Sequence, residues 1–248
     1  MPNRNWFLDW FNSPYYHLLY QERNETEAFD HIIKILSHLN PPSQSRMLDV
    51  ACGKGRHSKA LADQGFDVTG IDLSITSIEE AKQEETGNLR FYQHDMRLPF
   101  WINYFDYAFN LFTSFGYFST EREHNNAIRT IAQSLVSNGY FIMDYLNVHY
   151  AEDNLEKKQV KVVDGTRFHL TKWHDTEHFF KQVQVEEKGT PLKHLYTEKV
   201  AKFSLGDFTD MFAYQGLQVQ EVFGDYDLAA FNIRTSPRMI IIAKKVIR

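Results

Sequence analysis

Residues 48–58 read LDVACGKGRHS, and residues 68–72 read VTGID. Each segment begins as a short buried strand, and the first continues through Gly53 and Gly55 into a helix that opens near Ser58. Glycines between a strand and a helix let the backbone turn tightly and approach a ligand, while the helix N-terminus presents free N–H groups. The pattern therefore predicts a nucleoside-binding unit at the ends of two parallel strands.

Two carboxylates flank this loop. Asp72 lies 23 residues after Asp49, close to the offset of about 20 residues at which an acidic residue accepts ribose hydroxyls. A dinucleotide site usually reads G-x-G-x-x-G, whereas Ser58 stands here in the third place. Asp49, at the end of the first strand, would repel a pyrophosphate and attract an ammonium group. S-adenosylmethionine, with a nucleoside at one end and an amino acid at the other, satisfies both acids.

The loop resembles the glycine-rich motif of class I S-adenosylmethionine-dependent methyltransferases, usually written with Asp or Glu, x, Gly, x, Gly, x, Gly. Asp49, Gly53 and Gly55 match this motif, and Ala51 replaces its first glycine. That replacement is mild at a negative φ and awkward at a positive one. Together with residues 65–74, the loop is similar to small bacterial methyltransferases of the type 11/25 kind. The resemblance covers about residues 45–145 well and the two closing strands loosely.

The resemblance implies cofactor roles for a set of residues along the strand ends. These are Asp49, Ala51, Gly53, Gly55, Asp72, Leu73, Asp95, Met96 and Asn110. The first four would line the methionine part, with Asp49 on the ammonium group directly or through water. Asp72 would take the ribose hydroxyls, and the following leucine would lie against the adenine. Asp95 and its neighbour would read the adenine amino edge and pack on its face, although Asp95 could instead cap a turn beside Arg97. The backbone carbonyl of Asn110 would face the cofactor and the incoming nucleophile.

The order of segments predicts the fold class. Over residues 46–146, short buried strands alternate with helices, and such repeats imply parallel strands with right-handed crossovers. We therefore predict an α/β fold with a doubly wound, Rossmann-like, mostly parallel sheet, to which the resemblance adds a reversed last strand. Residues 204–248, a helix followed by two strands, complete this S-adenosylmethionine-binding domain.

Two further segments lie outside the shared motifs. Residues 1–45 predict an N-terminal helical lid, in which Ser13 caps a helix that begins with Pro14. Residues 147–203 alternate polar and apolar side chains, with hairpin turns expected at 164–165 and 188–189. We expect an antiparallel β insertion that covers the acceptor, because it branches from the carboxyl end of the fifth strand.

Composition narrows the class of protein. The chain has 248 residues, a net charge of −5, 43% hydrophobic residues and one cysteine, Cys52. No apolar run approaches the roughly 18 residues of a membrane span, and with no export signal the expected location is the cytoplasm.

A single cysteine excludes an internal disulfide and multi-cysteine metal sites. We expect no metal at the histidines near residues 169–178, since alternation along a strand separates their faces. An acidic chain argues against a nucleic acid partner, and both a monomer and a homodimer fit.

Aromatic residues make up 15% of the chain, a surplus that suits the wall of a site for a flat or cationic ligand as well as a core. The candidates for a substrate wall are Tyr15, Tyr16, Phe115, Tyr145 and Trp173. Each could equally be a core residue. For a general base the candidates are Tyr117, His149 and His57, which the sequence does not rank.

These observations predict methyl transfer to an oxygen or nitrogen of a small-molecule acceptor by in-line displacement. One alternative is a non-catalytic protein that binds S-adenosylmethionine. The other is a nicotinamide-dependent oxidoreductase, against which the position of Asp49 argues.

Overall fold

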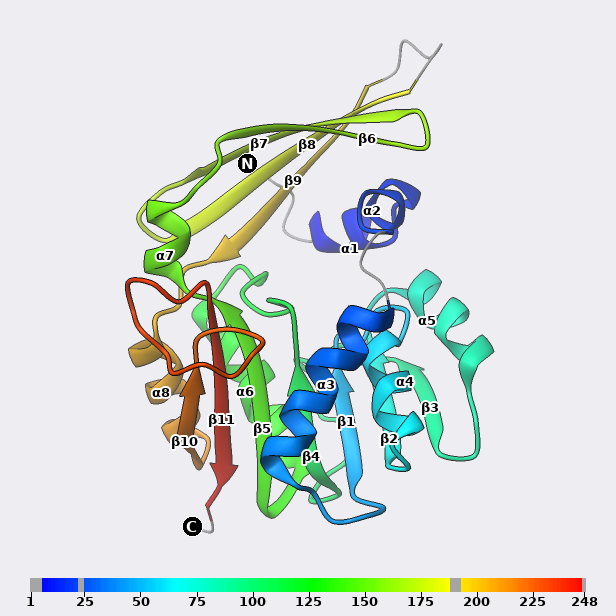
Figure 1. Ribbon diagram of the computed structural model, residues 1–248, viewed down its shortest axis with the longest axis vertical. Helices are drawn as coiled ribbons and strands as arrows, with labels where there is room; N and C mark the ends of the chain where they lie inside the picture. The colour runs from blue at the N-terminus through cyan, green and yellow to red at the C-terminus, as the bar shows by residue number, and fades with distance from the viewer. Residues whose placement is uncertain (1–5, 22–24, 188–192, 247–248) are drawn as a thin grey trace.

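A seven-stranded sheet forms the larger part of the computed structural model, which describes residues 6–21, 25–187 and 193–246 (Figure 1). Its strands lie in the order β10-β11-β5-β4-β1-β2-β3. Their bounds are β1 Arg46–Val50, β2 Asp67–Asp72, β3 Leu89–Gln93, β4 Phe105–Asn110, β5 Leu135–Leu146, β10 Leu217–Phe223 and β11 Arg238–Lys245. Strands β1 to β5 pair in parallel, and β11 runs antiparallel to both of its neighbours. The predicted doubly wound sheet with a reversed last strand is confirmed.

Helices cover both faces of this sheet (Figure 1). One face carries α3 (Glu25–Leu39), α4 (Arg56–Asp63) and α5 (Ile75–Ala81), the last followed by a 3₁₀ turn. On the other face lie α6 (Glu121–Ser134) and α8 (Leu205–Tyr214), each of which begins with a capping box. The chain turns from one side of β1 to the other between β3 and β4, so β1 and β4 are neighbours that define the switch point of the sheet. Open α/β sheets bind ligands at the carboxyl ends of the strands at such a point.

A second sheet of four antiparallel strands lies above the carboxyl edge of the first (Figure 1). It consists of β6 (Lys158–Val163), β7 (Thr166–His174), β8 (His178–Glu186) and β9 (Lys193–Ala201). Asp164 and Gly165 both have positive φ, as the predicted tight hairpin requires. The other predicted turn, at residues 188–189, lies outside the described residues.

Helices α1 (Trp6–Phe11) and α2 (Pro14–Leu19) fill the space between the two sheets (Figure 1). The Ser13 side chain caps α2 as predicted, since it accepts a hydrogen bond from the Tyr15 N–H. Trp10 is fully buried, with its ring centroid 4.7 Å from that of Tyr196 on β9. The N-terminal helices are therefore part of one core with the second sheet.

Two elements differ from the sequence-based expectation. A short helix, α7 (Val148–Asp153), follows β5 where the antiparallel insertion was expected to begin. The sequence pattern predicts the fifth strand over Tyr140 to Tyr145, whereas β5 begins five residues earlier, at Leu135, and its pairing with β4 shifts register in that region. Six residues are too few for a helical periodicity to show, and an irregular strand start lacks clean alternation. Within the described ranges, no helix is both long and apolar enough to cross a membrane.

Candidate active site

The loop after β1 is bonded directly to the end of β2. The N–H of Cys52 donates to the carbonyl oxygen of Ile71 at 3.0 Å, and the N–H of Gly53 donates to Oδ2 of Asp72 at 2.8 Å. The other oxygen of Asp72 accepts the N–H of Ser74 at 2.8 Å. Burial raises the pKa of Asp72, while the N–H groups of Ser74 and Gly53 oppose that shift. One carboxylate thus joins the two loops, and each of its oxygens keeps a lone pair for a further donor.

Asp49 lies beneath this loop with 1% of its surface exposed. Ser58, in the first turn of α4, donates its hydroxyl to Oδ2 of Asp49 at 2.6 Å. Burial raises the pKa of Asp49 to about 6, the charge of Asp72 adds to that shift, and the Ser58 hydrogen bond and Arg56 oppose it. A buried carboxylate beside a like charge is costly unless a cation compensates it. An ammonium group at this position would provide that compensation, so the pair of acids fits an adenosyl amino acid.

The backbone of the loop is left-handed at three positions. The φ angles are 60° at Ala51, 57° at Gly53 and 82° at Gly55. A Cβ on Gly55 would lie 2.4 Å from Cζ of Phe91, so this position requires glycine for both conformation and space. Ala51 replaces the first glycine of the motif at a positive φ, where a residue with a side chain costs about 1–2 kcal/mol of stability.

Asp95 follows β3 and makes its bonds within its own turn. Its carboxylate accepts three hydrogen bonds from the Arg97 guanidinium, at 2.6–3.1 Å, and one from the Arg97 N–H at 2.9 Å. Arg97 also pairs with Glu123 of α6 at 2.7 Å. Burial alone would raise the pKa of Asp95, but the bonds from Arg97 outweigh it and lower the pKa. The turn-capping alternative is therefore present, and Asp95 can meet an adenine only through the remaining lone pairs of its oxygens.

Asn110 ends β4 beside the glycine loop. It is fully buried, and its Nδ2 donates to the carbonyl oxygen of Val50 at 3.0 Å. Its Oδ1 is buried without a hydrogen-bond partner among the residues that the structure describes. Leu73 and Met96 are both half-buried and pack against the core cluster on the α6 side. The strand ends thus bring together the residues expected to hold the cofactor.

Residues 47–139 match a family model described as a methyltransferase domain. An uncharacterized methyltransferase of Staphylococcus carnosus (strain TM300) is 28% identical over 178 residues, which cover 70% of this chain and 81% of that protein. The dTDP-3-amino-3,4,6-trideoxy-alpha-D-glucopyranose N,N-dimethyltransferase of Streptomyces venezuelae is 30% identical over 132 residues, 52% of this chain and 54% of that protein. The crystal structure of a S-adenosylmethionine-dependent methyltransferase from Clostridium acetobutylicum ATCC 824 has a TM-score of 0.77 at 15% identity, covering 94% of this chain and 96% of that one.

The chain is therefore a methyltransferase, and its fold is that of the class I S-adenosylmethionine-dependent enzymes. The solved structures that share this fold include enzymes described as S-adenosylmethionine-dependent or bound to that cofactor. Both alternatives from the sequence, the nicotinamide-dependent oxidoreductase and the non-catalytic binding protein, are set aside.

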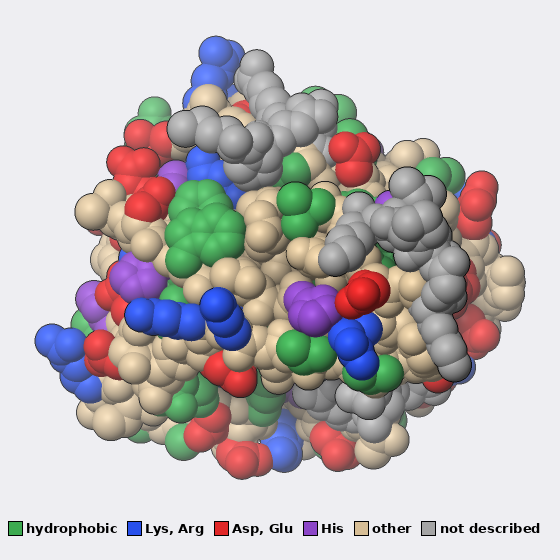
Figure 2. All heavy atoms as spheres, turned by 90° about the horizontal axis from the view of Figure 1, so that it is seen from above, with side chains coloured by type: hydrophobic (Ala, Val, Ile, Leu, Met, Phe, Trp, Pro, Cys, Tyr) green, Lys and Arg blue, Asp and Glu red, His purple; other side chains and the backbone are tan. Residues whose placement is uncertain are grey.

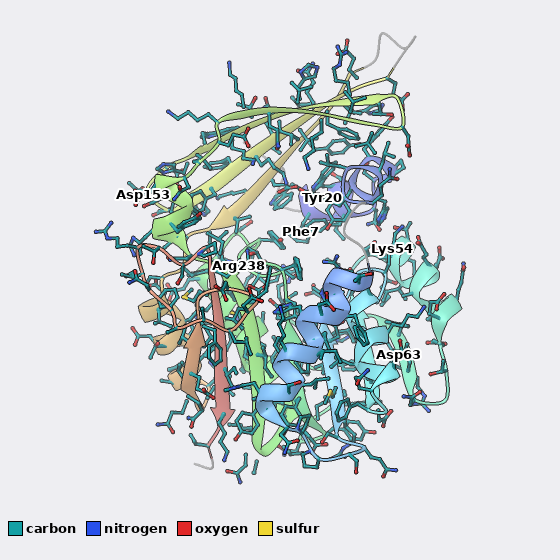
Figure 3. All side chains as sticks on the ribbon, viewed as in Figure 1. Phe7, Tyr20, Lys54, Asp63, Asp153 and Arg238 are labelled. Atoms are coloured by element: carbon teal, nitrogen blue, oxygen red, sulfur yellow. The ribbon has the colours of Figure 1, made fainter. Side chains whose placement is uncertain are left out.

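On the acceptor side of this methyltransferase, the segment after β4 forms a strained turn. Phe112 and Thr113 have φ angles of 56° and 60°. Asp144 of β5 holds both residues, since its Oδ2 accepts the Phe112 N–H at 2.8 Å and its carbonyl oxygen accepts the Thr113 N–H at 3.0 Å. Arg238 of β11 pairs with Asp144 at 2.7 Å and donates to Oγ1 of Thr113 at 2.9 Å. Figure 3 shows Arg238 at the carboxyl edge of the main sheet, with Phe7 of α1 above it.

The two residues predicted as catalytic lie near this edge in different settings. The Tyr117 hydroxyl donates to the carbonyl oxygen of Thr113, and its ring packs edge-on against Trp6 at 5.6 Å. His149 is half-buried on α7, where its charge helps Lys202 to lower the pKa of Glu152. Neither arrangement tests a catalytic role, so both residues stay predictions.

Three of the predicted wall residues do not fit that role. Phe115 and Tyr145 are fully buried and pack against Phe208 of α8, and the Tyr145 hydroxyl donates to the carbonyl oxygen of Ala201 at 2.5 Å. Trp173 stacks on Phe180 with centroids 5.2 Å apart. Alternation along β7 places Trp173 on the face opposite its buried residues, which is the solvent-facing surface of the second sheet. Figure 2 shows the molecule from above, the side on which the second sheet lies in Figure 1.

The other two wall candidates lie on α2. The Tyr15 ring is 4.8 Å from that of His194 on β9, and the Tyr16 ring is 5.5 Å from that of Trp10. Both side chains are half-buried. Tyr15 belongs to the contact between α2 and the second sheet, and Tyr16 to the contact between α2 and α1.

Proposed function

We propose that this methyltransferase moves the methyl group of S-adenosylmethionine to a nitrogen or oxygen of a small-molecule acceptor. The observation that carries the proposal is the pair of carboxylates on either side of the left-handed loop, the buried Asp49 and the half-buried Asp72. The similarity to a methyltransferase named for an amino sugar supports a small acceptor. When bound, the cofactor supplies a methyl group already activated by the positive charge on sulfur.

In this proposal the residues at the strand ends hold and orient the cofactor. Asp49 accepts the ammonium group and Asp72 accepts the ribose hydroxyls, while the loop backbone lines the methionine part. An acceptor lone pair forms the new bond to carbon, the electron pair of the broken C–S bond returns to sulfur, and the acceptor proton leaves to a base or to solvent. Orientation of two reactants in this way can lower the activation free energy by roughly 7–11 kcal/mol. Positioning is therefore the main contribution we assign to the protein.

The N-terminal helices act in this proposal as a lid on the cofactor. Oδ1 of Asn12, just after α1, accepts hydrogen bonds from Ser74 Oγ at 2.8 Å and Thr76 Oγ1 at 3.1 Å. Burial lowers the pKa of His17 on α2, and the charge of Lys54 in the glycine loop acts in the same direction. The lid is thus bonded to the segment after β2 and lies within electrostatic reach of the glycine loop, and exchange of the bound cofactor requires the Asn12 hydrogen bonds to open.

The second sheet is proposed to cover the acceptor together with this lid. Lys181 of β8 pairs with Glu198 of β9 at 2.6 Å, and the indole N–H of Trp10 donates to the same carboxylate at 2.7 Å. Lys181 also donates to the Tyr20 hydroxyl at the end of α2, on the underside of the sheet (Figure 3). Because these contacts are largely buried, helices α1 and α2 and the sheet would move as one cover.

The test combines binding with a search for product. Calorimetry with S-adenosylhomocysteine should give saturable binding that Asp72→Ala abolishes and Asp49→Asn weakens. Asp63→Asn is the matched control, since Asp63 is exposed at the far end of α4 (Figure 3). Incubation with methyl-labelled S-adenosylmethionine and a panel of amino sugars, alkyl amines and phenols should then transfer label to at least one compound. Unchanged binding in both site variants would refute the cofactor assignment, and tight binding without labelled product would refute the acceptor class.

A further inference from the structure

His31 of α3 is a buried polar side chain to which we assign no role in holding the cofactor. It is 2% exposed, and neither Nδ1 nor Nε2 has a hydrogen-bond partner within residues 6–21, 25–187 and 193–246. A neutral imidazole presents one N–H donor and one acceptor nitrogen. Because buried polar atoms of native proteins are nearly always paired, two unpaired atoms on one ring indicate a partner that the chain itself does not provide.

The ring lies in an aromatic group that we call the Phe112 cluster, made up of His31, Phe112 and Tyr226. The centroid of the His31 ring is 4.3 Å from that of Tyr226 and 5.9 Å from that of Phe112. Phe112 and Tyr226 stack on each other at 5.3 Å with an angle of 26° between their planes. His31 therefore sits against two flat apolar surfaces that can bind a ring or chain beside its nitrogens.

The Phe112 cluster lies where an acceptor must approach. Phe112 follows β4, the strand next to β1 at the switch point, and belongs to the strained turn described above. Arg56, the first residue of α4, acts electrostatically on both His31 and Asp49. The ring centroid of His57, the residue before the Ser58 that bonds Asp49, lies 6.5 Å from that of His31, so the histidine packs beside the first turn of α4. With the cofactor at the ends of β1 and β2, the β4 side is the side left for the second reactant.

The charged groups around His31 are mostly paired. Burial lowers the pKa of His31 to about 4, Asp144 opposes the shift, and Arg238, Lys34 and Arg56 add to it. Arg238 forms the buried pair with Asp144, and Lys34 pairs with Asp227 at the surface at 2.5 Å. His57, whose ring centroid is 6.5 Å away, is the other titratable neighbour on α4. His31 is uncharged at neutral pH, and its surroundings favour an uncharged ligand group over a free carboxylate or phosphate.

We propose that His31 is the hydrogen-bond partner of the methyl acceptor, which it binds through an uncharged amine or hydroxyl group carried on an apolar or ring-shaped body. The unprotonated imidazole nitrogen accepts the N–H or O–H hydrogen of that group, which leaves a lone pair of the group free for the methyl carbon. The rings of Phe112 and Tyr226 contact the body. This assignment rests on the proposed function. Access requires the segment between β10 and β11 to lift, because Tyr226 belongs to it and its hydroxyl donates to Asp144 at 3.1 Å. Besides the His31–Tyr226 ring contact, the exposed Lys34–Asp227 pair joins this segment to α3, and surface pairs of that kind oppose opening only weakly.

The test uses sinefungin, an analogue of the cofactor in which a carbon bearing an amine replaces the methylated sulfur. Its amine projects toward the acceptor, whereas S-adenosylhomocysteine has nothing there. By calorimetry we expect wild-type protein to bind sinefungin about fivefold more tightly than S-adenosylhomocysteine, as one added hydrogen bond gives. His31→Phe should reduce this ratio to about one and leave the affinity for S-adenosylhomocysteine unchanged.

His124→Phe is the matched control. His124 of α6 is another buried histidine, 4% exposed, and burial lowers its pKa to about 4 as well. It packs against Phe115, Phe118 and Phe203 on the opposite face of the sheet, so this variant should keep the wild-type ratio. If thermal unfolding shows that His31→Phe does not fold, His31→Leu removes the same nitrogens with less volume.

Each outcome decides between the assignments. A wild-type ratio near one, or the same ratio in wild type and the folded His31 variant, overturns the role of His31 and leaves the proposed function intact. Equal weakening of both ligands by the His31 substitution also overturns it, because His31 would then contact the part that the two ligands share. Failure of wild-type protein to bind either ligand refutes the proposed function itself.

Discussion

Lowering the pH from 7 to 5 should weaken binding of S-adenosylhomocysteine about tenfold through Asp49. An ammonium group needs this carboxylate ionised, and burial places its pKa at about 6 in the ligand-free protein. About nine-tenths of the side chains are ionised at pH 7 and about one-tenth at pH 5, a difference of about 1.4 kcal/mol in binding free energy. The effect of pH on folding stability through Asp49 has the opposite sign to its effect on binding. Because the folded-state pKa lies above the unfolded value, the contribution of Asp49 to stability is complete below about pH 4 and is lost as the pH rises through about 6.

Isothermal titration calorimetry at pH 5, 6 and 7, in buffers of different ionisation enthalpy, measures both the affinity and the protons released. Near pH 6 we expect proton release on binding, since the ligand ammonium lowers the pKa of Asp49. The Asp49→Asn variant should bind more weakly at pH 7 and lose most of the pH dependence of binding. We expect a small remaining pH dependence from Asp72, because burial also raises the pKa of that side chain. Asp63→Asn should retain the full dependence. An affinity independent of pH in wild type, or an equal slope in Asp49→Asn, would refute the reasoning.

Three further predictions concern the loops and the lid. Ala51→Gly should raise the free energy of unfolding in urea by about 1 kcal/mol, because glycine carries no penalty at the φ of 60°; a loss of stability would show that this backbone conformation is not strained. Asp144→Asn should lower the free energy of unfolding by about 3–5 kcal/mol, since it leaves the buried Arg238 without its counter-charge, and a change below about 1 kcal/mol would contradict a buried pair. Asn12→Ala should increase the dissociation rate of S-adenosylhomocysteine severalfold in stopped-flow measurements at unchanged thermal stability, and an unchanged rate would separate the N-terminal helices from cofactor exchange.

The main sheet could be predicted from the sequence because its signals are local. Buried strands, glycine loops and amphipathic helices repeat in order over residues 46–146, and the structure has the corresponding elements within a few residues. The reversed β11 came from the family resemblance, since no local feature of residues 238–244 gives their direction. Helix α7 was missed because a helix of six residues has too few turns to show periodicity.

The acceptor side was predicted less well, for two physical reasons. Aromatic content indicates that a residue is apolar but not which face it occupies, so the sequence predicts Tyr145 as a wall residue although it is fully buried. The face of Trp173 could have been derived, because Phe168 and Leu170 lie an odd number of positions away and alternation then puts the indole on the other side. Other contacts leave no local trace, such as the pair between Asp144 and Arg238, which are 94 positions apart.

Backbone strain locates the reactive edge without reference to any motif. Among the residues that the structure describes, nine non-glycine residues have positive φ, and four of them are Asn or Asp, which tolerate that region at little cost. Of the other five, Ala51, Phe112, Thr113 and Leu228 follow β1, β4 and β10 at the carboxyl edge of the main sheet, and Gln44 alone precedes a strand at the opposite edge. Strained backbone persists only where surrounding contacts hold it, as the bonds from Asp144 and Arg238 hold the turn after β4. Backbone strain, which costs stability, is thus concentrated along the edge where cofactor and acceptor must meet. This distribution is expected if the backbone conformation at that edge serves binding and does not serve the stability of the fold.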